Sequence, residues 1–138
     1  MQVEVRGKVP GGDRLPSVLV ELAWEVVTVR ELIRAAVEEQ IRCWRADRWR
    51  CRRMLDRQYL TEAEVQAQAA TGVVRLPAAG PVPEPDVSVE VDRAWRAFDK
   101  GVFAVFVNGG QVHGLEETVT LRLGEPVVFV RLIALVGG

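Results

Sequence analysis

The sequence predicts one α+β domain with a mixed sheet, a helix that crosses the sheet, and a helical insertion between that helix and the third strand. Three observations lead to this prediction: an alternating N-terminal segment, an amphipathic segment with a capping box, and β-rich segments near the C-terminus. The 138 residues, 49% hydrophobic and 27% charged, suffice for one globular core. We expect a single domain over 1-138, an insertion over 46-100 and a flexible tail over 134-138.

Two strands are predicted at the start of the chain. Residues 2–9 alternate between polar and apolar side chains, which is typical of a half-buried strand. Pro10-Gly11-Gly12-Asp13 has the composition of a turn, and residues 17–24 are again rich in β-forming side chains. We therefore expect an antiparallel hairpin with a long loop.

A helix is predicted to begin at Thr28, because Thr28 and Glu31 form a capping box. Apolar residues then recur at spacings of three and four and form one stripe that can pack across a sheet: Val29, Leu32, Ile33, Ala36, Val37, Ile41 and Trp44. The helical pattern continues through residues 42–59, and a second capping box at 61–64 precedes an Ala/Gln-rich stretch. We predict this middle region to be helical.

The second half of the chain is predicted to return to the sheet. Prolines concentrate in residues 76–86, which favours an extended connector, and a short helix with Trp95 and Phe98 is expected from Asp92 to near Gly101. Asn108-Gly109 is a strong signal for a tight reversal. The strands predicted around it are residues 102–107, 119–123 and 127–133.

Charge and composition narrow the classes of function. A net charge of -1 gives no overall attraction to nucleic acid or to anionic membranes. No apolar run approaches the length of a membrane span, and the N-terminus lacks a signal region, so we expect a cytoplasmic protein. Sixteen arginines against two lysines are typical of a GC-rich bacterial genome. Cys43 and Cys51, about 12 Å apart along a helix, are expected to be buried free thiols without a role.

Three C-terminal segments carry a resemblance to a known family. Residues 104–109 read AVFVNG, residues 124–130 read GEPVVFV, and the sequence ends in Val136-Gly137-Gly138. In this order they resemble the closing half of the thiamin and molybdopterin sulfur carriers, which are ubiquitin-like proteins of the β-grasp fold. The resemblance covers roughly the first 45 and last 37 residues, and residues 45–101 have no counterpart in those minimal carriers. It implies a β-grasp fold for this chain.

The resemblance also implies how the tail would be used. An adenylating enzyme of the ubiquitin-activating type would activate the carboxylate of Gly138 with ATP, while Gly137 passes through a narrow channel. The same enzyme would hold Val136, Leu135 and Arg131 in extended form. ATP and a zinc ion would belong to that enzyme. This chain would bind no cofactor or metal and would not be an enzyme.

We favour a bacterial ubiquitin-like modifier that reaches its target through a thioester, because the insertion offers a surface for dedicated enzymes. A conjugating enzyme, a deconjugating peptidase and protein targets would then be its further partners. The alternatives are a sulfur carrier with a C-terminal thiocarboxylate and a β-grasp adaptor that is never conjugated. Lys8 and Lys100, the only lysines, limit self-conjugation.

Seven arginines and two tryptophans lie within residues 42–57, which suggests a nucleic-acid surface, a solvated helix face or an interface with an acidic protein. We favour the solvated face or protein interface, prefer the interface of these two, and do not expect nucleic acid as a partner. The docking patch for a conjugating partner is predicted at Arg45, Arg48, Trp49 and Arg52. His113 and Glu116-Glu117 lack the neighbours that a metal site or a catalytic pair requires.

Overall fold

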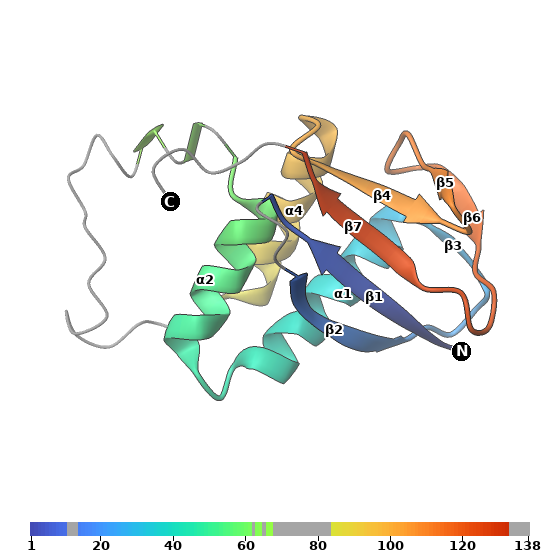
Figure 1. Cartoon of the computed structure of the whole chain (residues 1–138), viewed down its shortest axis with the longest axis horizontal. Coiled ribbons are helices and arrows are strands. Elements are labelled where there is room, and N and C mark those ends of the chain that lie inside the picture. The colour runs from blue at the N-terminus through green and yellow to red at the C-terminus, as the bar shows by residue number, and fades with distance from the viewer. Residues whose placement is uncertain (11–13, 62, 65, 68–83, 133–138) are drawn as a thin grey trace.

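The structure is a computed structural model that describes residues 1–10, 14–61, 63–64, 66–67 and 84–132 (Figure 1). Its strands are β1 (Gln2–Lys8), β2 (Arg14–Glu21), β3 (Val26–Thr28), β4 (Phe103–Val107), β5 (Gly110–Gln111), β6 (Thr118–Thr120) and β7 (Val127–Arg131). Its described helices are α1 (Val29–Trp44), α2 (Arg48–Tyr59) and α4 (Val87–Asp99). None of these helices is long and apolar enough to cross a membrane.

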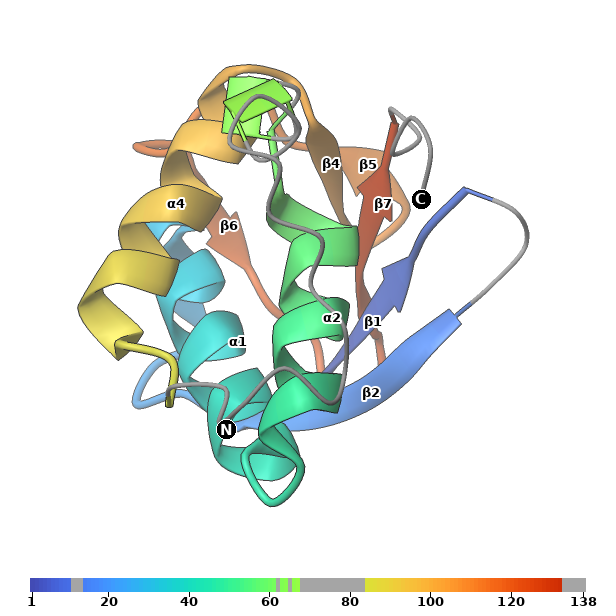
Figure 2. The same ribbon diagram turned by 90° about the vertical axis from the view of Figure 1, so that its left-hand side faces the viewer.

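Five strands form a mixed sheet in the order β2-β1-β7-β4-β5. The two strands at its centre, β1 and β7, run parallel, whereas every other neighbouring pair is antiparallel. The three helices lie on one side of this sheet, as Figure 2 shows. The predicted α+β class with a mixed sheet and a crossing helix is therefore confirmed.

The hairpin β1–β2 agrees with the sequence prediction, although β2 begins at Arg14 rather than at residue 17. Residues 11–13 of the predicted turn lie outside the described residues. Along β1, the side chains of Val3 and Val5 are buried and those of Gln2 and Arg6 are exposed, as the alternating sequence requires.

Helix α1 begins where the capping box predicts it. The Oγ1 atom of Thr28 accepts a hydrogen bond of 3.1 Å from the amide of Glu31, and all seven residues of the predicted apolar stripe are buried. Residues 42–59 are largely helical, as predicted, but the helix is interrupted at residues 45–47. Helix α1 ends at Trp44, and α2 begins at Arg48. The carboxylate of Asp47 caps α2 by accepting a hydrogen bond of 3.1 Å from the amide of Arg50.

Helix α4 begins five residues earlier than the expected start at Asp92. The carboxylate of Asp86 accepts a hydrogen bond from the amide of Val89, and this cap starts the helix directly behind Pro85. Residues 76–83 of the predicted connector lie outside the described part of the chain. The helix ends before Gly101, whose φ of 72° is a left-handed conformation that glycine adopts without strain.

The tight turn after β4 agrees with the prediction. Asn108 and Gly109 have φ angles of 52° and 79°, the positive pair of a type I′ turn that joins β4 to β5. The sequence did not predict the second, two-stranded sheet, in which Val26–Thr28 pairs with Thr118–Thr120. The amide of Asn108 ties this small sheet to the turn, because its Nδ2 donates 2.9 Å to the carbonyl of Thr120.

The core joins α2 to the sheet through a cluster of aromatic rings. The ring centroid of Tyr59 lies 5.2 Å from that of Phe103, and Phe103 lies 5.4 Å from Phe129 and 5.9 Å from Phe98. The buried hydroxyl of Tyr59 donates 2.7 Å to Oε1 of Gln40 in α1. The described part of the insertion therefore shares one hydrophobic core with the sheet.

The buried position of Tyr59 leads us to expect that the folded chain loses stability at alkaline pH. Burial raises its pKa above the ordinary value of 10.0, although its hydrogen bond with Gln40 acts in the opposite direction. Above pH 10 the unfolded tyrosine loses its proton and the folded one retains it, so the free energy of unfolding decreases as pH rises. Because Tyr59 is the only tyrosine, its tyrosinate absorbance reports on one residue.

We expect tyrosinate to form only together with loss of the far-ultraviolet circular dichroism of the helices. Tyr59→Phe should abolish the tyrosinate signal and serves as the blank. A tyrosinate transition centred near pH 10 in a chain that is still folded would contradict the buried position of Tyr59.

Candidate functional site

The end of β7 is where the chain leaves the sheet toward its C-terminus. Arg131 is the last residue of the strand, and the amide of Leu132 donates 2.8 Å to the carbonyl of Val102. The predicted activation residues Gly137 and Gly138 lie outside the described residues, as do Leu135 and Val136. The described part of the candidate site is therefore the anchor of the tail.

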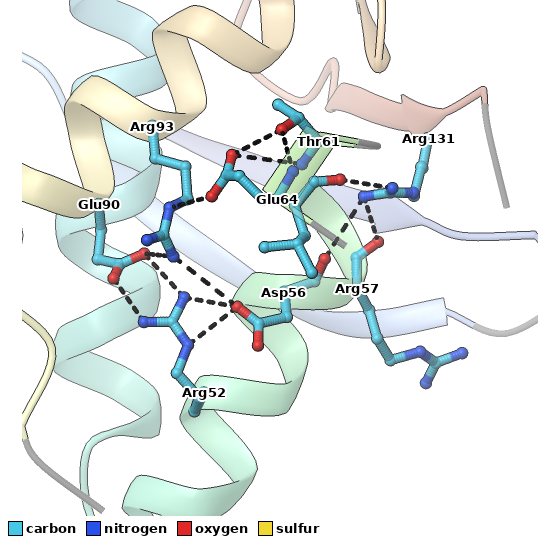
Figure 3. A network of polar contacts seen from close by, with 9 residues as sticks. Arg52, Asp56, Arg57, Thr61, Glu64, Glu90, Arg93 and Arg131 are labelled. Atoms are coloured by element: carbon cyan, nitrogen blue, oxygen red, sulfur yellow. Dashed lines mark hydrogen bonds and ion pairs between the residues drawn. The ribbon is translucent and has the colours of Figure 1, made fainter. Parts of the chain in front are cut away.

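Arg131 forms this anchor by binding helix α2. Its side chain is buried, and its guanidinium donates 2.6 Å to the carbonyl of Leu60, 3.2 Å to that of Arg57 and 3.4 Å to that of Asp56 (Figure 3). These carbonyls lie at the C-terminal end of α2, where the helix dipole favours a cation. The tail recognition predicted for Arg131 stays a prediction, and in this structure its guanidinium is turned to α2.

Arg52 connects α2 to α4 about one turn before the carbonyls that bind Arg131. Its guanidinium forms a bidentate pair with the carboxylate of Glu90, with 2.9 Å between Nη2 and Oε2, and also contacts Asp56 at 2.7 Å. The side chains of Arg52 and Glu90 are only 13% and 5% exposed. Burial acts to lower the pKa of Arg52, but its bonds to these carboxylates outweigh this effect and raise it.

A second arginine extends this network toward the end of α2. The Nε atom of Arg93 lies 2.8 Å from Oε2 of Glu64, an ion pair whose geometry falls short of a hydrogen bond. Glu64 also accepts 2.9 Å from the hydroxyl of Thr61, and its own amide donates 3.2 Å to that hydroxyl. Charged and polar groups therefore run continuously from α4 to the turn that follows α2 (Figure 3).

The face of the sheet opposite the helices is partly apolar. Phe106, Val128 and Val130 are half-buried there, and Val128 lies between Phe106 and Arg6 in the strand register. Lys8 pairs in the same way with Val130. This face therefore presents apolar side chains of β4 and β7 beside the basic side chains of Arg6 and Lys8 on β1, where Arg6 pairs with Glu4.

The structure separates the four residues of the predicted docking patch. Arg45 and Arg48 are exposed, Trp49 is half-buried, and Arg52 lies inside the ion-pair network between α2 and α4. Sequence periodicity did not reveal this difference, because the helix was expected to continue without a break from residue 42. The sequence did contain one indication that a new helix begins here, because Asp47 is of a residue type favoured at helix N-caps.

The two cysteines are free thiols, as predicted, but only Cys51 is buried. The expected burial of both is wrong for Cys43, which is exposed and donates 3.4 Å to Oε1 of Glu39. Burial raises the pKa of Cys51, and partial desolvation together with the carboxylate of Glu39 raises the pKa of Cys43. Both shifts disfavour the thiolate, which is the reactive form of a cysteine.

The remaining polar candidates have structural contacts. Glu116 pairs with Arg30 at 2.7 Å, and Glu117 accepts 2.7 Å from the amide of His113. Among the residues that the structure describes, no group of three His, Cys, Asp or Glu side chains is placed to hold a metal ion.

In comparisons with known proteins, no family model, no curated protein and no solved structure matches the chain with significance.

Proposed function

We propose that this chain is a ubiquitin-like modifier of the β-grasp fold, whose Gly138 carboxylate is adenylated by an enzyme of the ubiquitin-activating type and transferred to a protein target through a thioester. The observation that carries the proposal is the order of the sheet, β2-β1-β7-β4-β5, with a parallel pair at its centre. An N-terminal hairpin, a helix across one face and a final central strand are the parts of a β-grasp domain. The sequence after that strand ends in Gly-Gly.

The anchor at Arg131 supports this use of the tail. A carboxylate can be presented to an enzyme reproducibly only if the segment that bears it starts from a fixed point. Arg131 and the backbone bond of Leu132 supply such a point, and six residues follow Leu132. Fully extended, these residues span at most about 20 Å, which is enough to reach into a channel.

The chemistry balances without a catalytic group on this chain. A carboxylate oxygen of Gly138 attacks the α-phosphorus of ATP, pyrophosphate leaves, and an acyl-adenylate forms. A cysteine thiolate of the partner then attacks the acyl carbon and AMP leaves with the bonding electron pair. An amine of the target finally displaces the thiolate and loses a proton. The glycines contribute by leaving the carbonyl carbon open, since they have no Cβ.

The experiment compares the full chain, tagged at its N-terminus, with a variant that lacks Gly137-Gly138. Both are expressed in the cells that naturally produce the protein, purified under denaturing conditions and analysed by intact-mass and peptide mass spectrometry. We expect the full chain to yield covalent adducts through Gly138 and the shortened chain to yield none above background. Equal circular dichroism of the two chains, purified separately under native conditions, is the control for folding.

The products distinguish the modifier from its alternatives. A branched peptide with Gly138 on a target amine supports the modifier, and replacement of one carboxylate oxygen by sulfur indicates a sulfur carrier instead. Adducts that persist without Gly137-Gly138, or a natural chain that retains further residues after Gly138, would overturn the proposal. Adenylation itself is measured separately. The activating enzyme is isolated through its covalent adduct with the full chain, and ATP–pyrophosphate exchange is then assayed with that enzyme and the chain.

A further inference from the structure

Four exposed arginines surround the first turns of α2 and are called the arginine surface here. Its members are Arg45, Arg48, Arg50 and Arg53. Arg50 and Arg53 are three residues apart on the helix and therefore neighbours on its surface, and Trp49 lies four residues before Arg53. The arginine surface thus combines concentrated positive charge with one half-buried indole ring.

The positive charge of this surface is not neutralised within the described residues. None of its four guanidinium groups forms an ion pair with a carboxylate there. Two nearby carboxylates are engaged elsewhere, since Glu39 binds Arg42 and Asp56 binds Arg52. Asp47 caps α2 and adds one negative charge beside the four positive ones. Three of these like charges lie on α2 and the fourth, Arg45, at the C-terminal cap of α1. Without an ion-pair partner among the described residues they repel one another, so a partner protein that neutralises them would gain electrostatic energy.

We propose that the arginine surface binds an acidic, carboxylate-rich segment of another protein. A guanidinium offers a planar fork of donors that matches a carboxylate, and the same helix already shows this geometry in the pair of Arg52 with Glu90. Trp49 adds apolar contact area beside the charges. The inference does not depend on activation of Gly138.

Two observations favour a protein over a nucleic acid. The chain has a net charge of -1, so the remainder of the molecule is net negative and repels a long polyanion that extends beyond the arginine surface. Single-stranded nucleic acids are also held by open aromatic platforms, whereas Trp49 is half-buried and offers only part of its ring. A short acidic peptide segment can neutralise the arginines without extending over the rest of the protein surface, which is net negative.

The test uses a labelled peptide of about a dozen glutamates and a labelled thymidine oligonucleotide of equal charge, titrated with the full chain in about 50 mM NaCl. The test variant combines Arg48→Gln, Arg50→Gln and Arg53→Gln. The matched control combines Lys8→Gln, Lys100→Gln and Arg122→Gln, which removes the same charge from three exposed positions elsewhere. We expect the test variant to raise the Kd for the peptide about tenfold and the control to raise it less than about twofold.

Each result decides the inference. If the test variant and the control variant weaken peptide binding equally, binding depends only on the net charge of the chain, and the inference is overturned. If the chain binds the oligonucleotide more tightly than the peptide, and the test variant loses this binding, the arginine surface binds nucleic acid. That result also overturns the inference. If the triple variant is less folded than the control by circular dichroism, Arg53→Gln alone should still raise the Kd about twofold to threefold. A chain without Gly137-Gly138 should bind as the full chain does, so failure of Gly138 activation and failure of this surface are separable.

Discussion

Glu90→Gln is expected to lower the free energy of unfolding by about 3 kcal/mol, because it leaves the guanidinium of Arg52 in a largely dry environment with half of its carboxylate contacts. Both side chains of the Arg52–Glu90 pair are nearly inaccessible, and the pair is bidentate. Asp56 remains as a partner of Arg52, so the expected loss lies at the lower end of the range for a broken buried pair. Urea unfolding followed by circular dichroism measures this change.

Helix α4 offers a matched control for this prediction. Asp92 pairs with Arg96 at 3.1 Å, but both side chains are about 60% exposed, so Asp92→Asn should change stability by less than about 0.5 kcal/mol. Combining Glu90→Leu with Arg52→Met removes both charges and should recover most of the loss. A Glu90→Gln effect no larger than that of Asp92→Asn would mean that the network does not hold α2 to α4.

Arg131→Ala is expected to lower the free energy of unfolding by about 2 to 3 kcal/mol. The variant removes a charged donor from the carbonyls at the end of α2 and leaves the space of a long side chain. Burial lowers the pKa of Arg131, because desolvation disfavours its charged form. We also expect faster hydrogen exchange in the last turn of α2, measured by mass spectrometry.

Arg122→Ala is the control for this change, because Arg122 is an exposed arginine in the turn before β7 and its loss should alter stability by less than about 0.5 kcal/mol. Should Arg131→Ala leave both stability and exchange unchanged while it weakens adenylation, Arg131 would act on the partner enzyme instead. Reduced stability with unchanged adenylation of the folded fraction would make its role purely structural.

The sequence predicted those parts of the fold that short segments determine by themselves. The cap at Thr28 and the Asn108-Gly109 turn need only neighbouring residues to form, and both occur as expected. The break at Asp47 was missed because apolar periodicity runs on through it, although the cap residue was visible. The sequence did not predict the early start of α4, because the proline-rich composition of residues 76–86 favours an extended connector up to that point.

The candidate site shows the limit of such prediction more clearly. Val127 and Phe129 are buried on the helix side of the sheet, and the alternation of a strand places Arg131 on that same side. The alternation of apolar residues along this strand therefore predicts an inward-facing arginine from the sequence alone. By contrast, nothing in the sequence links Arg52 to Glu90, because they are 38 residues apart and meet only through the packing of two helices.

The parallel pair at the centre of the sheet has a consequence for synthesis. Strand β1 is made first among the described strands and β7 last, yet the two are neighbours. Until β7 leaves the ribosome, the edge of β1 that it will cover presents unpaired backbone groups, which are a template for aggregation. A prematurely terminated chain therefore lacks the central strand as well as the tail. The sheet can therefore be completed only after synthesis has passed Arg131, the last residue of β7.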